Sequence, residues 1–178
     1  MRLFLGLGLP DSVTETLARF QTGLGPVRWV ERRNMHITLK FLGEVETGDA
    51  EDLDSVLQHL DVAAFTLTLA GMGSFGKGRD TRAVWAGVEP SPELTHLQAK
   101  VERLCQMQRF KAEQRKFTPH VTLAWTKGVK LGRIDAYMAQ GTLLRAGPFA
   151  VAEVNLYRSH LGAKGADYEV LASYPLAN

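Results

Sequence analysis

Two segments of the chain carry a histidine and a threonine at the same spacing, and they are the first candidates for chemistry. Residues 36–39 read His-Ile-Thr-Leu, and residues 120–123 read His-Val-Thr-Leu. Successive side chains of a β-strand point to opposite faces, so His36 and Thr38 would share one face. An imidazole can give or take a proton near neutral pH, and a hydroxyl can donate to an anionic oxygen. If both segments face one cleft, His120 and Thr122 complete a set of one acid, one base and two donors.

A non-catalytic explanation also exists for these two motifs. Each could be a half-buried strand that carries a histidine with no role in a reaction. We favour catalysis because the repeat extends beyond the two polar residues: an apolar residue separates them in both copies, and a leucine follows in both. The sequence therefore predicts one active site built from two distant parts of the chain.

The paired motifs resemble the two His-x-Thr-x signatures of the two-histidine (2H) phosphoesterase superfamily. They are most similar to its branch of RNA 2',3'-cyclic phosphodiesterases, also called 2'-5' RNA ligase-like proteins. Other segments carry the same resemblance, the last of them more weakly: Arg2–Pro10, Phe41–Val45, Phe117–His120 and Val154–Ser159. The resemblance thus spans nearly the whole chain.

This resemblance implies an α+β fold with two lobes, each an antiparallel sheet with helices outside, related by a pseudo-twofold axis across a central groove. It also implies hydrolysis of an RNA 2',3'-cyclic phosphate to a 2'-phosphate, with no metal ion and no cofactor. In this family pattern His36 is the proton donor, His120 is the proton acceptor, and Thr38 and Thr122 bind the phosphate. Reversal of the reaction would give 2'-5' RNA ligation as a secondary activity. The two equivalent motifs cannot by themselves say which histidine is the acid.

One position departs from the family pattern. The family commonly has an arginine five residues after the second histidine, whereas this chain has Trp125 there. Lys127 and Arg158 are candidates to supply the missing positive charge. Lys40 is another candidate, because it would lie on the same face as the first motif if that strand is regular. Phe41, in the extended first motif, is a further candidate for substrate binding.

Length and composition favour a single globular domain or two small lobes that share an interface, and the family resemblance implies one domain over residues 1–178 made of two intertwined lobes with one motif each. The chain has 178 residues, of which 45% are hydrophobic and 22% are charged. The lone Cys105 cannot form an internal disulfide, no apolar run is long enough to span a membrane, and the first residues already form a strand rather than a signal peptide. We expect a cytoplasmic monomer with no membrane partner.

The basic residues are unevenly placed although the net charge is only +2. Clusters that precede both motifs would favour a polyanionic partner, either RNA with a 2',3'-cyclic phosphate end or a small cyclic nucleotide, including a cyclic phosphate of ADP-ribose. An ordinary solvated surface is the alternative explanation. The clusters consist of Arg28, Arg32 and Arg33 before the first motif, and of Lys111, Arg115 and Lys116 before the second.

Residue periodicity predicts an alternation of strands and helices. Helices are expected within 10–23, 49–60, 91–104 and 132–140, and strands over 2–9, 65–69, 82–88, 149–157 and 168–174 in addition to the two motif strands. A polar, glycine-containing segment from Arg158 to Asp167 would join the last two strands. This order indicates two α+β lobes related by duplication.

Residues 71–76 read Gly-Met-Gly-Ser-Phe-Gly and match a dinucleotide-binding pattern. That pattern must open a helix whose N-terminus meets a pyrophosphate. Residues 77–81 have no apolar helical period and a strand follows them, so we reject a dinucleotide site. We expect a mobile connection here, from which Lys77 and Arg79 could contact a nucleic-acid backbone.

Two other functional classes remain possible. A metal-dependent hydrolase is disfavoured because the chain has no His-x-x-x-His or Cys-x-x-Cys spacing. A non-catalytic RNA- or nucleotide-binding module would keep the groove but not the reaction, and Trp125 leaves room for this interpretation.

Overall fold

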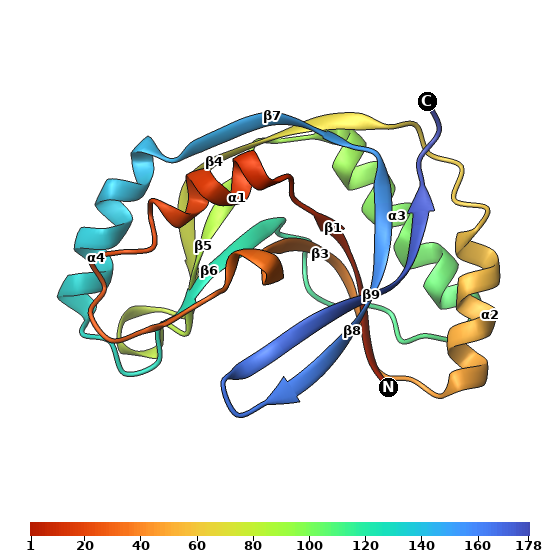
Figure 1. The fold of residues 1–178 in the computed structure, drawn as a ribbon, viewed down its shortest axis with the longest axis horizontal. Coiled ribbons are helices and arrows are strands. Elements are labelled where there is room, and N and C mark those ends of the chain that lie inside the picture. Colours follow the sequence, from red (N-terminus) through yellow and green to blue (C-terminus); the bar gives the residue numbers. More distant parts are fainter.

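The computed structural model describes residues 1–178 and contains two antiparallel sheets (Figure 1). The strands are β1 (Arg2–Gly8), β2 (Arg28–Trp29), β3 (His36–Glu44), β4 (Phe65–Phe75), β5 (Ala83–Val88), β6 (His120–Trp125), β7 (Arg145–Val151), β8 (Glu153–Gly162) and β9 (Gly165–Pro175). Sheet A has the order β3-β1-β8-β9, and sheet B has the order β2-β6-β5-β4-β7. Each sheet holds one motif strand, β3 or β6. The predicted α+β fold with two antiparallel sheets is confirmed.

The helices cover the two sheets in a crossed manner. They are α1 (Asp11–Ala18), α2 (Thr47–Leu57), α3 (Pro92–Met107) and α4 (Leu131–Gln140). Helix α1 follows β1 of sheet A but packs against β7 of sheet B, whereas α3 follows β5 of sheet B but packs against β3 of sheet A. In Figure 1, α1 and α4 therefore lie on the side of sheet B, and α2 and α3 lie on the side of sheet A. No helix is long and apolar enough to cross a bilayer.

One hydrophobic core joins both sheets and positions the motifs. A continuous cluster of 31 buried residues includes Ile37 and Leu39 of β3 together with Val121 and Leu123 of β6. These are the apolar partners of the two His-x-Thr motifs. Since they enter the core, alternation turns the histidines and threonines to the opposite face of each strand.

Helix α3 forms for reasons that the sequence displays. The Oγ atom of Ser91 accepts a hydrogen bond from the Leu94 N–H group at 3.1 Å, and Pro92 occupies the first turn, where no donor is needed. One face is buried at helical spacing, and near the end of the helix Cys105 takes the inward position while Leu104 is half-buried. The buried residues are Leu94, Leu97, Val101 and Cys105.

The expectation of a mobile connection at Gly71–Gly76 is wrong. Residues Gly71–Phe75 continue β4, which pairs with β5 through Gly73 opposite Trp85 and Phe75 opposite Ala83. A Cβ atom at Gly73 would lie 2.1 Å from the indole of Trp85, so this glycine is required by close packing. The glycines therefore serve a strand, and only residues 76–82 connect β4 to β5.

The predicted strand over 149–157 is two strands in different sheets. Strand β7 ends at Val151 in sheet B, and β8 begins at Glu153 in sheet A. The predicted polar connection from Arg158 to Asp167 also differs, because β8 and β9 run on as a hairpin as far as Gly162 and Gly165. Much of this extension is exposed, so it lacks the hydrophobic alternation by which strands are recognised.

Removal of the Ser91 cap should weaken the protein measurably. The Ser91→Ala variant leaves the Leu94 N–H group without its side-chain acceptor, and we expect the free energy of unfolding to fall by about 1 kcal/mol. Urea unfolding measures this change. Ser55→Ala is the matched control, because Ser55 donates to the Glu51 carbonyl within α2 and caps nothing; its effect should stay within about 0.5 kcal/mol. Equal effects of the two variants would contradict the capping role.

Candidate active site

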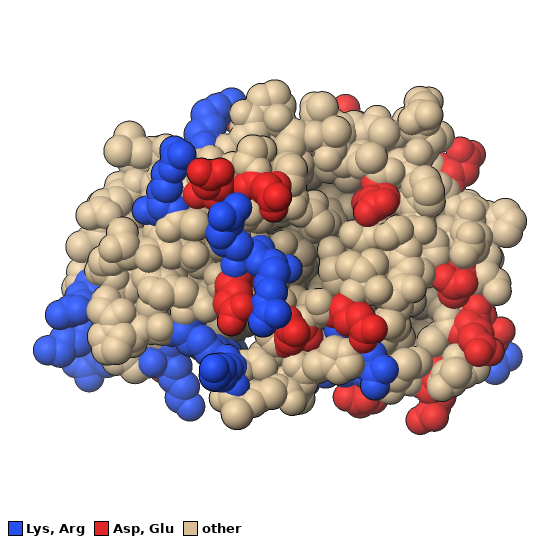
Figure 2. Space-filling view, in the orientation of Figure 1, with Lys and Arg blue, Asp and Glu red and all other residues tan.

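Both motifs line one groove of about 850 Å³ between the two sheets. His36 and Thr38 reach it from β3, and His120 and Thr122 reach it from β6. The two motif strands approach each other where the sheets meet, and Figure 2 shows a hollow at the centre of this face. The structure thus brings together four side chains that lie far apart in the sequence.

The ring of His36 is held by two hydrogen bonds. Its Nδ1 atom lies 2.7 Å from the Asn34 carbonyl oxygen, and its Nε2 atom lies 2.9 Å from Thr38 Oγ1. A carbonyl oxygen only accepts, so Nδ1 carries the hydrogen, and in the neutral ring Nε2 accepts from the threonine hydroxyl. The ring packs 4.8 Å from the ring of Phe4 and edge-on at 5.1 Å from that of Tyr168.

Burial determines the protonation of His36. Desolvation disfavours the imidazolium and lowers the pKa of His36 from 6.5 to about 4, while the Asn34 carbonyl opposes this shift and a charge on His120 adds to it. The imidazoles are therefore close enough for the charge of one to act on the other. In the free protein His36 is neutral at pH 7.

His120 is oriented in the same way from the other sheet. Its Nδ1 atom lies 2.7 Å from the Thr118 carbonyl oxygen, so this nitrogen also carries the hydrogen. Burial lowers the pKa of His120 below its ordinary value, although the Thr118 carbonyl acts in the opposite direction. The ring packs against two aromatic rings that also contact each other, with centroid distances of 4.7 Å to Phe75 and 5.5 Å to Trp85. In both motifs Nε2 is the nitrogen left for proton transfer.

The groove has no grouping of side chains suited to a metal ion. No set of three or more His, Cys, Asp or Glu residues is placed to hold one. The chemistry open to this arrangement is proton transfer by two imidazoles, combined with hydrogen bonding of an anionic group by hydroxyls and nearby cations.

Lys40 differs from its predicted placement beside Thr38. The β1–β3 pairing skips Leu39, a bulge that reverses the alternation of faces after Thr38. Lys40 borders the groove, yet its side chain is buried and its Nζ atom lies 2.8 Å both from Glu102 Oε2 and from the Lys111 carbonyl oxygen. The ammonium group is therefore committed to the protein.

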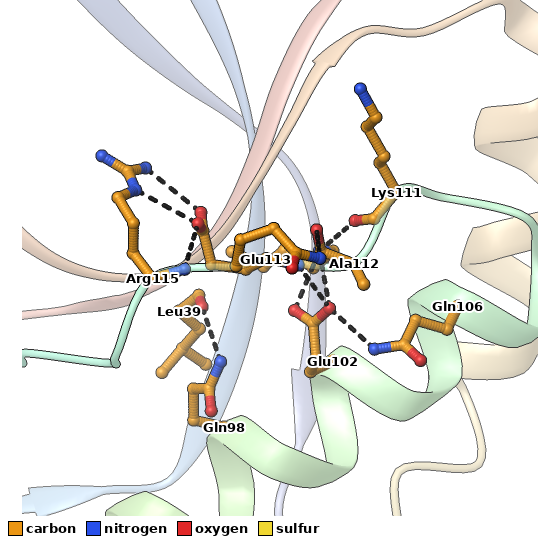
Figure 3. Close-up of polar contacts among 10 residues, drawn as sticks. Leu39, Gln98, Glu102, Gln106, Lys111, Ala112, Glu113 and Arg115 are labelled. Carbon is orange, nitrogen blue, oxygen red and sulfur yellow. Dashed lines mark hydrogen bonds and ion pairs between the residues drawn. The ribbon is translucent and has the colours of Figure 1, made fainter.

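The contacts of Lys40 with Glu102 and with the Lys111 carbonyl oxygen tie the first motif strand to the segment that leads into the second motif. Figure 3 shows Glu102 and Gln106 of α3 beside that segment, which carries Lys111, Glu113 and Arg115. The Glu102 carboxylate also accepts from the Glu113 N–H group at 3.1 Å, and the Glu113 carboxylate accepts from the Arg115 guanidinium. Burial opposes ionisation of Glu102, but the hydrogen bonds from Lys40 and Gln106 outweigh it and hold its pKa below the usual value. Helix α3 thus links the approaches to both histidines.

The other predicted binding residues divide into two groups. Phe41 lines the groove, is 64% exposed and lies 6.0 Å from the ring of Phe4. Lys127, in the turn after β6, and Arg158, on β8, do not line the groove. The structure therefore gives no support to either as the replacement for the family arginine.

The basic side chains that line the groove include some from the predicted clusters and some that the sequence did not single out. Arg28, Arg115 and Lys116 belong to the predicted basic clusters and do reach it, whereas Arg32 and Arg33 bind other parts of the protein. No local pattern marks the additional residues, because they come from strand ends and from the β8–β9 turn. They are Arg2, Arg82 and Lys164, together with the aromatic Tyr168.

The family follows from a comparison with known proteins. Residues 9–163 match the 2'-5' RNA ligase superfamily. The chain belongs to this superfamily. It is 31% identical to an RNA 2',3'-cyclic phosphodiesterase of Methanocaldococcus jannaschii, over 98% of this chain and 100% of that one. It is 32% identical to an RNA 2',3'-cyclic phosphodiesterase of Geobacillus stearothermophilus, over 97% of this chain, and spans 56% of that protein's length.

A comparison with solved structures shows the same fold in another protein. The crystal structure of E. coli LigT complexed with 3'-AMP matches with a TM-score of 0.82 and 27% identity, over 99% of this chain and 98% of that one. The family resemblance of the motifs and the fold that it implied are both confirmed.

The pKa of His36 should make stability depend on pH. The unfolded chain binds a proton at His36 near pH 6.5, whereas the folded chain binds it only near pH 4. Between these two pH values the proton binds the unfolded chain preferentially, so the free energy of unfolding is highest above pH 6.5 and falls as the pH is lowered to about 4. Across this window the wild type should lose about 3 kcal/mol more than His36→Gln, whose side chain does not titrate. Urea unfolding at a series of pH values measures the difference, and parallel curves would contradict the buried neutral state.

The Lys40–Glu102 pair should be strongly coupled. The two side chains are 3% and 15% exposed, so Lys40→Met leaves a buried carboxylate uncompensated and should cost about 3–5 kcal/mol of unfolding free energy. The Lys40→Met/Glu102→Leu double variant should lose less than the sum of the single variants. Arg145→Ala is the control, since it breaks the exposed pair with Glu89 and should cost about 1 kcal/mol or less. Additive effects at Lys40 and Glu102 would contradict the coupling.

Proposed function

We propose that this protein is an RNA 2',3'-cyclic phosphodiesterase that opens the cyclic phosphate to a 2'-phosphate. The observation that carries the proposal is the convergence of His36, Thr38, His120 and Thr122 on one groove from two sheets. Both imidazoles are fixed in the tautomer that leaves Nε2 toward a reacting group. The relatives named RNA 2',3'-cyclic phosphodiesterase support the same activity.

In the proposed reaction His120 acts as the general base. Its lowered pKa keeps it neutral at pH 7, so Nε2 can take a proton from water as the oxygen attacks phosphorus. The bond from phosphorus to the 3'-oxygen breaks, and Nε2 of His36 gives its proton to that oxygen. The product is a 3'-hydroxyl and a 2'-phosphate. Thr38 and Thr122 hold the non-bridging oxygens while negative charge develops on them.

The low pKa of His36 fits a donor that becomes charged when the substrate binds. An anionic phosphate beside the ring favours the imidazolium and raises its pKa. Once Nε2 is protonated it can no longer accept from the Thr38 hydroxyl, which lies 2.9 Å away. That hydroxyl is then free to donate to a phosphate oxygen. Protonation of His36 and phosphate binding by Thr38 therefore support each other.

Small cyclic nucleotides are a second proposed class of substrate, and cyclic phosphates of ADP-ribose belong to it. This class is favoured because E. coli LigT has been crystallised with 3'-AMP, and the groove of about 850 Å³ has room for a mononucleotide. RNA 2'-5' ligation is proposed as the reverse reaction. We further propose a monomer, because one chain supplies both halves of the groove, and a cytoplasmic location, in keeping with a single buried, unpaired Cys105.

Turnover of a 2',3'-cyclic mononucleotide tests the proposed function. We expect His36→Ala and His120→Ala each to lower kcat by about 100-fold or more, because each variant removes one proton-transfer group. Each should also lose one limb of the bell-shaped pH profile, and a chelator should leave the wild-type rate unchanged. Phosphorus NMR should identify the product as the 2'-phosphate.

His96→Ala is the control for this assay, since His96 is exposed on α3 and lies outside the groove. Full activity of either motif variant would exclude the two-histidine reaction. A wild-type protein that binds the mononucleotide but never turns it over would instead be a binding module.

A further inference from the structure

We propose that Arg28, together with Trp125, forms a second nucleotide subsite at the mouth of the groove. This subsite would bind the phosphate and base next to the terminal nucleoside of a single-stranded RNA. The inference rests on the proposed function and specifies the form of its substrate. With this subsite the protein would prefer the end of an RNA strand to a free cyclic mononucleotide as its substrate.

Strand pairing brings the two side chains together. Strand β2 lies at the edge of sheet B, and its pairing with β6 sets Arg28 opposite Trp125. The Arg28 guanidinium carbon lies over the indole, 5.8 Å from the ring centroid. On the other side of β6, Trp125 pairs with Ala83, the first residue of β5, and the residue before it, Arg82, also lines the groove. Strand pairing thus places Arg28 against Trp125, and Arg82 directly precedes the residue that pairs with Trp125 on its other side.

The cationic groups of this platform are available to a ligand. Arg28, Arg82 and Trp125 all line the groove, and Trp125 is 43% exposed. Neither arginine pairs with a carboxylate, whereas Arg115 in the same groove is bound by Glu113. A cation–π contact orients a guanidinium without using its N–H donors. Arg28 is therefore positioned and keeps its donors for a phosphate.

The β8–β9 turn closes the subsite from the other sheet. A Cβ atom at Gly165 would lie 3.8 Å from both Cδ and Nη1 of Arg28, so the arginine stem reaches across the mouth of the groove to this turn. Lys164, beside Gly165, also lines the groove. Figure 2 shows most lysines and arginines of this face on the half that holds α4, where some acidic residues lie among them, and mainly acidic residues on the half that holds α2. The charge distribution favours entry of a polyanion on the side of the platform.

The platform lies too far from the motifs to share their phosphate. Trp125 is three residues beyond Thr122 on β6, which corresponds to about 10 Å at the rise of a β-strand. If Thr122 holds the terminal cyclic phosphate of an RNA, Arg28 is therefore placed to bind the next phosphate of the same strand. Proteins that bind single strands commonly combine an aromatic face for a base with cations for the backbone, and this platform offers both.

Three substrates separate the contributions. They are a nucleoside 2',3'-cyclic phosphate, the same compound with a 5'-phosphate, and a dinucleotide that ends in a 2',3'-cyclic phosphate. We expect kcat/KM of the wild type to be higher for the compound with the 5'-phosphate than for the one without it, because of the added phosphate. The dinucleotide should have the highest kcat/KM of the three. In Arg28→Gln the ratio of kcat/KM for the dinucleotide to that for the first substrate should fall about tenfold, and the slope of log kcat/KM against log salt should decrease by about one.

Matched variants test the role of the ring. Trp125→Ala should lower the same ratio, whereas Trp125→Phe keeps an aromatic face and should retain much of it. Arg103→Gln is the control, because Arg103 is an exposed arginine of α3 outside the groove and should leave the ratio unchanged. An unchanged ratio in Arg28→Gln would overturn the subsite.

Binding of the products separates failure of the subsite from failure of the proposed function. If the wild type hydrolyses none of the three substrates, the proposed function fails, and the subsite is then judged by affinity alone. Fluorescence titration with a dinucleotide that ends in a 2'-phosphate and with a nucleoside 2'-phosphate should give tighter binding of the dinucleotide. That preference should be lost in Arg28→Gln, and equal affinities in the wild type would overturn the subsite.

Discussion

The site depends on the burial of two apolar pairs, Ile37 with Leu39 and Val121 with Leu123, in a core that both sheets share. Side chains of a strand alternate with a period of two, so a slip of one residue would turn the histidine into the core and expose the apolar residues. The cost of such a slip fixes the register of both motif strands. Hydrophobic packing on one face therefore specifies the position of the polar groups on the other.

The same burial gives the histidines their acid–base character. Each ring is oriented by a carbonyl oxygen two residues earlier in the chain, and each has a lowered pKa because it is removed from water. A neutral imidazole suits the base directly, whereas the acid needs an anion beside it to become charged. Similar buried environments can thus suit both the general base and the general acid, and the histidine that becomes protonated is the one beside the bound anion.

Much of the fold and the centre of the site could be predicted from the sequence. The motifs are local patterns, so their strands and their shared face follow from alternation, and the family resemblance supplied the two sheets. Lys40 could not be placed, because the bulge at Leu39 arises from pairing with β1. The change of sheet between β7 and β8 also leaves no trace in hydrophobicity, since apolar residues occur on both sides of Ala152. Arg28 meets Trp125 only through long-range strand pairing.

The crossed arrangement of strands and helices ties the two halves of the chain to each other. Sheet A takes β1 and β3 from the first half and β8 and β9 from the second, while β4 of the first half lies between β5 and β7 in sheet B. A cut in the connection between β4 and β5 would leave two fragments, neither of which holds a complete sheet. Such fragments would have to reassemble in order to fold, so the symmetry of the motifs does not make either half an autonomous folding unit.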